Sequence, residues 1–303
     1  MGLFTSDLFL KAYAPVRGAV PIFGHNMWIV KRGFVTLAEC SPLNGFIEQP
    51  NPTDILETAV RSHAWSVWFT SDKTVAHKEF RELPPYPTFL TFPEFKPGKK
   101  LRWALRKSKK LKLIVEDGKA VAIRHLLDKL WERLDRSISI EFYLTLEAAS
   151  VGRTIYAIHD GHICTGLFYL IGTNGERYMF SLATDPKYRG TDVTSFLVAE
   201  FLRRSFEEGT PYVDLCGCSV PSIYAFKRHF ASTVAWRPRY LAVLNPLWHL
   251  LWFQMRHLFR SRSDHIPERE QWRSLLVDDL ARTKTGPPTS NPNAVQSHQA
   301  YCT

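Results

Sequence analysis

Two hairpin turns in the middle of the sequence constrain the fold more than any other feature. Asp160-Gly161 and Asn174-Gly175 each separate two runs of largely apolar residues. Both dipeptides are favoured in two-residue hairpin loops, because the central residues of such turns need positive φ angles. The pattern therefore predicts three consecutive antiparallel strands. The expected strands cover residues 153–158, 163–171 and 177–184.

A turn, a helix and a further strand follow these three strands. The polar turn at 185–191 contains Arg189 and Gly190, and apolar residues then recur at helical spacing over 192–208. Another strand is expected at 212–215. The first turn of a helix presents unpaired N–H groups and the positive end of its dipole, so this turn suits an anionic group such as a pyrophosphate. An ordinary connection with a solvated Arg189 is the alternative.

The motifs in this region resemble the acyl-CoA-binding core of the GNAT acyltransferase superfamily. Asp185-Pro-Lys-Tyr-Arg-Gly190 precedes the helix, and Asp214-Leu-Cys-Gly217 is followed by Phe226-Lys227-x-x-Phe230. The second pair of motifs is similar to the FemAB-like branch, which includes peptidoglycan aminoacyltransferases and acyltransferases of polysaccharide gene clusters. The resemblance covers roughly residues 90 to 250.

One departure from the superfamily pattern concerns the donor site. The superfamily usually has further glycines two and four residues after the first, where this chain has Asp192 and Thr194. That change puts a standard cradle for the phosphates of coenzyme A in doubt. It is also a tendency of the FemAB-like branch, some members of which use aminoacyl-tRNA.

The resemblance implies an α/β fold with mixed sheets, built from two GNAT-like domains in tandem, and we expect one sheet in each. Residues 1–134 would form an N-terminal half that ends in a basic helix and an amphipathic helix. Residues 135–259 would form the acyltransferase core. Residues 260–303 would be a charged segment and a disordered tail, since the composition from Arg282 onward is typical of disorder.

The resemblance also implies the residues that bind the donor. Backbone N–H groups of a strand interrupted near Leu182 or Ala183 would stabilise the oxyanion of the tetrahedral intermediate. Arg189, Gly190 and Thr191 would hold the donor's phosphates. The co-substrate is expected to be acyl-CoA, with aminoacyl-tRNA as the alternative and no metal.

Three further residues are candidates for the chemistry. Lys227 matches the Phe-Lys motif and would stabilise developing negative charge; a surface lysine is the alternative. Tyr224 is a candidate general acid toward the leaving thiolate, although in the simplest alignment the superfamily's usual Tyr position holds Phe226. Asp214 is a candidate general base or a residue that only caps its loop.

A basic run lies ahead of this core. Residues 99–112 contain eight lysines and arginines and no acidic residue. Arg102, Arg106 and Lys107 are the candidate substrate-binding residues, because Arg gives bidentate phosphate contacts and Lys supplies a point charge. A solvated helix face is the alternative, and a calmodulin-like or nucleic-acid patch is a weaker one.

Composition favours an anionic partner. The 303-residue chain has a formal net charge of +10 and a pI near 9.4, which suits nucleotide-linked or lipid-linked substrates. We expect a nucleic acid only if the donor is aminoacyl-tRNA. Five scattered cysteines favour a reducing compartment, and we predict a cytoplasmic location without a signal peptide. Residues 246–259 are apolar and either contact the inner face of the membrane or pack against the sheet.

Three N-terminal features complete the expected structure. Residues 26–37 should form a strand pair that turns at Gly33. Residues 50–61 should be a helix capped by Thr53. Prolines between residues 84 and 87 should form a rigid loop.

These observations predict an acyltransferase. It would move an acyl or aminoacyl group from a thioester or ester donor to an amine of an acceptor that contains a sugar or a peptide. The alternative is a catalytically degenerate GNAT-fold module that binds phosphate-containing ligands, and Asp192 and Thr194 favour it.

Overall fold

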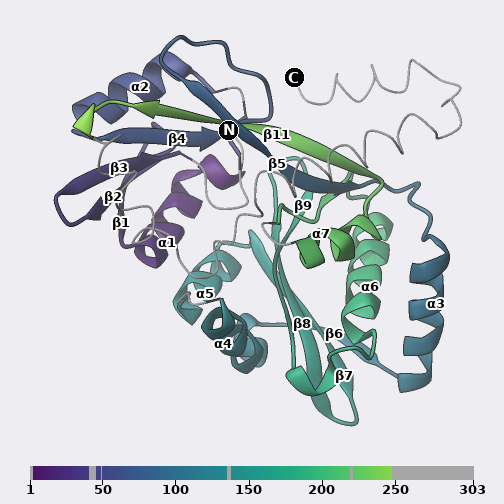
Figure 1. The fold of residues 1–303 in the computed structure, drawn as a ribbon. Helices are drawn as coiled ribbons and strands as arrows, with labels where there is room; N and C mark the ends of the chain where they lie inside the picture. Colours follow the sequence, from purple (N-terminus) through teal and green to yellow (C-terminus); the bar gives the residue numbers. More distant parts are fainter. Residues whose placement is uncertain (1–2, 41–45, 49, 135–137, 219–220, 248–303) are drawn as a thin grey trace, which may run out of the picture. The chain divides into compact units, whose positions relative to one another are not determined.

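The computed structural model describes residues 3–40, 46–48, 50–134, 138–218 and 221–247. Within them, one eleven-stranded mixed sheet runs through both halves of the chain, in the order β1-β2-β3-β4-β11-β5-β10-β9-β8-β7-β6 (Figure 1). The strands are β1 (Ala19–Ile22), β2 (Met27–Arg32), β3 (Val35–Glu39), β4 (Ser66–Thr70), β5 (Arg81–Thr91), β6 (Ile114–Gly118), β7 (Gly152–His159), β8 (His162–Ile171), β9 (Arg177–Thr184), β10 (Val213–Asp214) and β11 (Thr233–Val243).

The single sheet differs from the two sheets that the sequence predicts. β11 pairs with β4 on one side and β5 on the other, and β5 also pairs with β10. The C-terminal strand therefore lies inside the N-terminal half and makes the two halves continuous. Such pairing between distant segments leaves no local pattern in the sequence.

The predicted consecutive hairpins are confirmed. β7 pairs with β8 and β8 with β9, both antiparallel. Asp160 and Gly161 both have positive φ angles, as a two-residue hairpin turn requires. The second connection differs from the prediction, because residues 172–176 form a longer loop and, of the Asn174-Gly175 pair, Gly175 alone has a positive φ angle. The predicted strands near 153–158, 163–171, 177–184 and 212–215 all belong to this one sheet.

Helices cover both faces of the C-terminal half of the sheet. On β8, Phe168 packs against Tyr143, with ring centroids 4.8 Å apart, and the next residue, Tyr169, packs against Phe201. Because successive strand residues point to opposite faces, Tyr143 and Phe201 mark helices on opposite sides. The helices are α1 (Asp7–Arg17), α2 (Pro52–Arg61), α3 (Lys99–Ser108), α4 (Arg124–Arg133), α5 (Ile140–Ala148), α6 (Val193–Glu207) and α7 (Pro221–Arg228), with 3-10 turns η1 (Leu3–Thr5), η2 (Lys109–Leu111), η3 (Ala120–Ile123) and η4 (Pro186–Tyr188).

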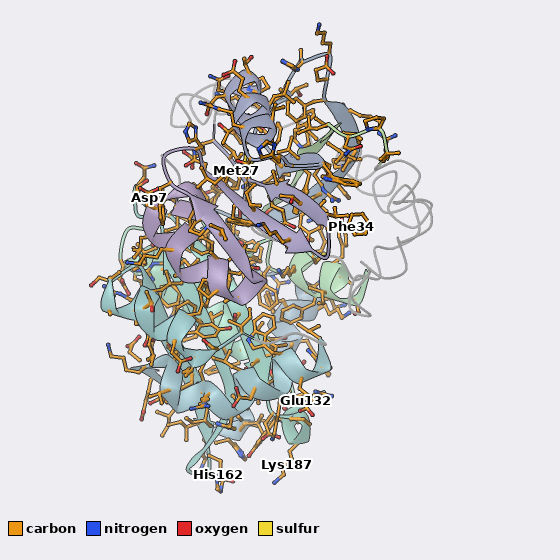
Figure 2. All side chains as sticks on the ribbon, turned by 90° about the vertical axis from the view of Figure 1, so that its left-hand side faces the viewer. Asp7, Met27, Phe34, Glu132, His162 and Lys187 are labelled. Carbon is orange, nitrogen blue, oxygen red and sulfur yellow. The ribbon has the colours of Figure 1, made fainter. Side chains whose placement is uncertain are left out.

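An aromatic core joins α1 to both halves of the molecule. Phe9 and Tyr13 of α1 stack on each other and contact Phe142 of α5, and Tyr13 also contacts Trp28 of β2. The indole N–H of buried Trp28 donates to Glu39 Oε2 at 2.9 Å. Figure 2 draws the side chains of the described part of the chain, turned by 90° from the first view.

Two predictions for the N-terminal half were wrong in detail. Asn51 caps α2 by accepting from the Asp54 N–H at 3.3 Å, whereas we expected Thr53, which lies inside the helix. Pro52 occupies the first helical position, where its missing N–H costs nothing.

The prolines between residues 84 and 87 lie in β5 and not in a loop, so that prediction was also wrong. The pairing of β5 with β11 shifts between Arg237, opposite Tyr86, and Arg239, opposite Leu83. The bulge leaves Pro84 and Pro85 outside the ladder, where proline is tolerated because it has no N–H to donate. Pro87 lies within the ladder, opposite Trp236.

None of the helices in the described part of the chain is long and apolar enough to cross a membrane. The predicted apolar segment 246–259 lies outside the described residues apart from Pro246 and Leu247, and residues 260–303 lie outside them entirely.

We expect Phe168→Ala to lower the free energy of unfolding by about 3 to 5 kcal/mol, because Phe168 is fully buried and truncation leaves a cavity. The matched control is Phe34→Ala, since Phe34 is 68% exposed and should change stability by less than about 0.5 kcal/mol. Urea unfolding measures both, and equal effects would contradict the core described here.

Candidate functional site

The sheet opens between β9 and β10. These parallel strands pair over two residues only, Val213 with Arg177 and Asp214 with Tyr178. Beyond Tyr178, β9 continues to Thr184 beside β8, whereas β10 ends at Asp214. The outer edge of β9 after Tyr178 therefore has no strand partner among the described residues.

The backbone of β9 places an N–H on this open edge. A bulge at Phe180 separates the pair Phe168–Ser181 from the pair Tyr169–Met179. After the bulge, Ala183 lies opposite Gly166 and the Asp185 N–H donates to Cys164 O at 2.9 Å. Because alternate residues of an antiparallel ladder point to opposite sides, the Leu182 N–H faces away from β8. The predicted interruption near Leu182 or Ala183 thus lies close to the bulge, and the role of both residues as oxyanion donors stays a prediction.

A compact turn connects β9 to α6. Asp185 Oδ1 accepts from the Lys187 N–H at 2.9 Å, and Thr191 Oγ1 donates to Tyr188 O at 2.6 Å. Gly190 has a φ of +80° and open space where a side chain would lie. Arg189 and Gly190 are exposed to solvent, so both are accessible to a ligand.

The N-terminus of α6 carries no side-chain cap. Asp192 precedes the helix with a φ of +67°, and its side chain makes no capping hydrogen bond. The first helical bond is from the Phe196 N–H to Asp192 O at 3.0 Å. The N–H groups of residues 193–195 are therefore free of intrahelical partners, as in an anion site.

Cations from two helices, α3 and α4, lie close to this turn. Lys107 Nζ of α3 lies 3.6 Å from Asp192 Oδ2, and Lys129 Nζ of α4 lies 3.5 Å from Asp185 Oδ2. Partial burial and the nearby charge of Arg189 lower the pKa of Arg133. The two carboxylates are thus paired with lysines, whereas Arg133 and Arg189 are two positive charges close together. An anionic ligand bound between these two arginines would reduce their repulsion.

One residue of the predicted basic helix α3, Lys107, lies at the turn. Leu101, Ala104 and Ser108 of α3 are buried, and α3 contacts α6. Of the three predicted substrate-binding residues, Lys107 lies at the turn; Arg102 and Arg106 are exposed. Their role in substrate binding stays a prediction.

Asp214 lies at the end of β10 in a dense network. Its Oδ1 accepts from Thr88 Oγ1 at 2.5 Å and from the Cys216 N–H at 2.7 Å, and its Oδ2 accepts from Arg237 Nη2 at 3.0 Å. The side chain is 2% exposed. This geometry favours the capping alternative over the general base, although the general-base role stays a prediction.

Lys227 is buried and fully engaged. Its Nζ donates to the carbonyl oxygens of Leu215, Cys216 and Gly217 at 2.6, 3.2 and 2.8 Å. An ammonium has three N–H donors, so these bonds use all of them. Burial lowers the pKa of Lys227, and the nearby charges of Cys216, Cys218 and Asp214 oppose this shift. Any oxyanion contact would require one of these bonds to be exchanged, and that role stays a prediction.

Tyr224 belongs to α7 and is also buried. Its ring lies 5.1 Å from the Phe89 ring in an edge-to-face arrangement and 6.3 Å from the Trp236 ring. Its role as a general acid stays a prediction.

The sequence singles out Thr194 without showing its contacts. Thr194 Oγ1 lies 2.7 Å from Thr184 Oγ1, which in turn lies 2.9 Å from Thr165 Oγ1, so the hydroxyl that replaces a glycine links α6 to the sheet. Sequence reasoning missed Lys129 and Arg133. Their spacing of four residues on an amphipathic helix was the available signal.

The fold is similar to that of several solved structures. FemX matches with 13% identity, 80% of this chain and 93% of that chain covered, and a TM-score of 0.60. The C-terminal domain of a protein described as a lysylphosphatidylglycerol synthetase from Agrobacterium fabrum matches with 18% identity, 81% and 89% coverage, and a TM-score of 0.55. L-PGS from Bacillus licheniformis matches with 13% identity, 78% and 86% coverage, and a TM-score of 0.53.

These likenesses confirm the predicted fold, a tandem GNAT-like fold of the FemAB-like type. A scan against protein-family models finds no match, and a search of curated proteins finds none either.

We expect Lys227→Met to lower the free energy of unfolding by about 2 to 4 kcal/mol, because it leaves three buried carbonyl groups without their donor. The matched control is Lys78→Met, since the Lys78 side chain is 88% exposed. Thermal and urea unfolding measure both variants. Unchanged stability in Lys227→Met would mean that the three bonds do not hold the loop.

Proposed function

We propose that the chain is a GNAT-fold transferase. It moves an acyl or aminoacyl group from a thioester or ester donor to an amine of an acceptor that contains a sugar or a peptide. The observation that supports this most is the opening between β9 and β10 beside the uncapped N-terminus of α6. An elongated donor can place its carbonyl at the open strand edge and its phosphates at the helix.

The residues of this chain then have defined tasks. The Leu182 N–H donates to the oxyanion that forms when the amine attacks the carbonyl carbon, and this contact is strongest in the transition state. The new C–N bond forms as the C–S or C–O bond of the donor breaks. The amine loses a proton to solvent or a nearby base, and the leaving group takes one up. Arg189 and the free N–H groups of α6 hold the donor's phosphates.

The donor is acyl-CoA or aminoacyl-tRNA. Asp192 and Asp185 place two carboxylates beside the phosphate site, each next to a lysine. One of the similar structures is described as a lysylphosphatidylglycerol synthetase. The compound in that name is an anionic lipid that carries a lysyl group, which is an aminoacyl group. That name and the basic α3 support a nucleotide- or lipid-linked acceptor and a cytoplasmic protein that works at the inner face of the membrane.

A binding module without chemistry is the second candidate. Asp214, Lys227 and Tyr224 are all buried in structural contacts, and this observation favours it. The two candidates are separated by release of free thiol from acetyl-CoA, or of uncharged tRNA from aminoacyl-tRNA. Release that depends on an added amine supports the transferase. Donor binding without release, across a panel of amino sugars and peptides, supports the module.

We expect Arg189→Ala to weaken binding of the donor by about tenfold, because it removes one charge-assisted contact to phosphate. Calorimetric titration with coenzyme A and with tRNA measures the change. The matched control is Lys78→Ala, which removes an exposed cation and should bind like the wild type. Equal affinity in Arg189→Ala would move the phosphate site away from this turn.

A further inference from the structure

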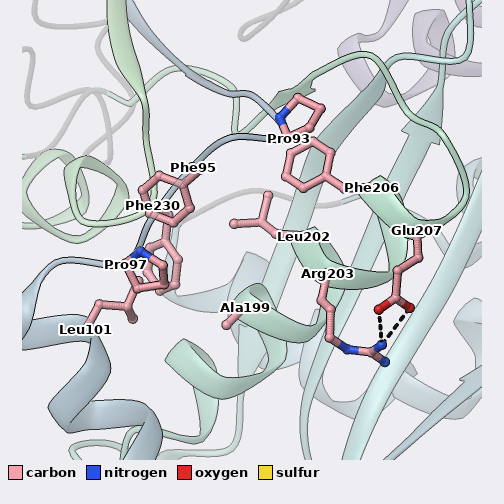
Figure 3. A pocket seen from close by; sticks show the side chains of 10 residues that line it. All are labelled: Pro93, Phe95, Pro97, Leu101, Ala199, Leu202, Arg203, Phe206, Glu207 and Phe230. Atoms are coloured by element: carbon pink, nitrogen blue, oxygen red, sulfur yellow. Dashed lines mark hydrogen bonds and ion pairs between the residues drawn. The ribbon is translucent and has the colours of Figure 1, made fainter.

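A mostly apolar groove adjoins the C-terminal half of α6. Among the described residues, an open groove of about 510 Å³ runs between the residues before α3, α3 itself and the C-terminal half of α6 (Figure 3). Buried Leu101, Leu202 and Phe230 line it. Its other lining residues are Pro93, Phe95, Pro97, Ala199, Arg203, Phe206 and Glu207.

The two charges in the lining neutralise each other. Arg203 Nη1 donates to both carboxylate oxygens of Glu207 at 2.6 Å, and its remaining donors bind Glu200 at 2.6 and 2.8 Å. The guanidinium is therefore occupied by its own helix, as Figure 3 shows for Glu207. The rest of the lining is apolar, which suits a hydrocarbon chain and excludes a polar ligand along its length.

A basic helix borders this groove. Lys100, which directly precedes the lining residue Leu101 on α3, is exposed. Burial and the nearby charges of Lys100 and Arg228 lower the pKa of His229, so the imidazole favours its neutral form and the positive charge comes from the lysines and arginines. An apolar groove beside a basic helix is complementary to an anionic amphiphile.

The exposed face of α3 combines basic residues with a tryptophan. Trp103 is 57% exposed on α3, with Lys107 Nζ 5.4 Å from its ring centroid. Lys99, Arg102 and Arg106 are exposed on the same helix. Tryptophan flanked by lysines is characteristic of a membrane interface, where the ring lies at the level of the headgroups.

We propose that the groove binds one hydrocarbon chain of an anionic membrane lipid, with Lys100 and the other exposed basic residues of α3 at its phosphate, and so docks the protein on the bilayer surface. The site is separate from the donor site. Ala199 and Glu207 lie six and fourteen residues after Val193, which is about 9 and 21 Å along the helix axis. The proposal is independent of transfer chemistry, because vesicle binding is measured without a donor.

The test is co-sedimentation of the full chain with vesicles of phosphatidylcholine, with and without phosphatidylglycerol. We expect binding only to the anionic vesicles. Ala199→Trp fills the groove and Lys100→Glu reverses one rim charge, and each should weaken binding by about fivefold or more. Val60→Trp on α2 and Lys78→Glu are the matched controls, since both positions are exposed and lie outside the groove.

Several results would overturn the proposal. Wild-type binding in Ala199→Trp would show that the groove holds no lipid chain. If Ala199→Trp melts early, Phe95→Ser gives the same test, because Phe95 lies outside the helices. Absence of vesicle binding together with RNA binding that Lys100→Glu abolishes would assign the surface to nucleic acid. A dimer that Ala199→Trp dissociates, with vesicle binding unchanged, would assign it to a second copy of the chain.

Discussion

The buried carboxylate of Asp214 holds together the region where the two halves of the sheet meet. It accepts hydrogen bonds from Thr88 of β5, from Arg237 of β11 and from the Cys216 N–H. A buried carboxylate is costly unless it is paired and fully hydrogen-bonded, so these groups fix one another's positions. The bond to Cys216, whose φ is +60°, turns the chain directly after β10. The opening beside β9 follows from that turn.

Lys227 stabilises the same turn, because its ammonium binds the carbonyl groups of three successive residues. Gly217 is required there, since a Cβ would lie 1.9 Å from the Tyr86 ring and 2.8 Å from the Pro87 carbonyl. In this account Asp214 and Lys227, the charged residues of the two motifs, hold the backbone that forms the opening between β9 and β10. The electrostatic stabilisation of a reaction would then come from backbone N–H groups, which are fixed in direction before the substrate binds.

The sequence predicts those parts of the structure that local signals determine. The Asp-Gly and Asn-Gly turns place three strands correctly, and the helical spacing after Asp192 places α6 to within a residue at each end. The insertion of β11 between β4 and β5 could not be predicted, because strand pairing over long separations depends on tertiary packing. The prolines of β5 indicate a loop until the opposing bulge at Arg237 and Arg239 is known.

The candidate site was also predictable only where local sequence signals determine it. The turn with Arg189 and Gly190 could be located from a pattern of residue types. The engagement of Asp214 and Lys227 could not, because a motif gives the identity of a charged side chain and not its burial or its partners. Arg133 and Lys129 come from a helix that looks purely structural in the sequence, and only its packing brings them to the turn.

Amide hydrogen exchange tests the central claim most directly, because it reports on the open strand edge and the helix N-terminus separately. The account predicts that acetyl-CoA or aminoacyl-tRNA slows exchange at residues 180–184 and 190–195, while exchange in β1 to β3 stays the same. Protection confined to other segments, or unchanged exchange with either donor, would contradict the assignment of the opening between β9 and β10 as the donor site.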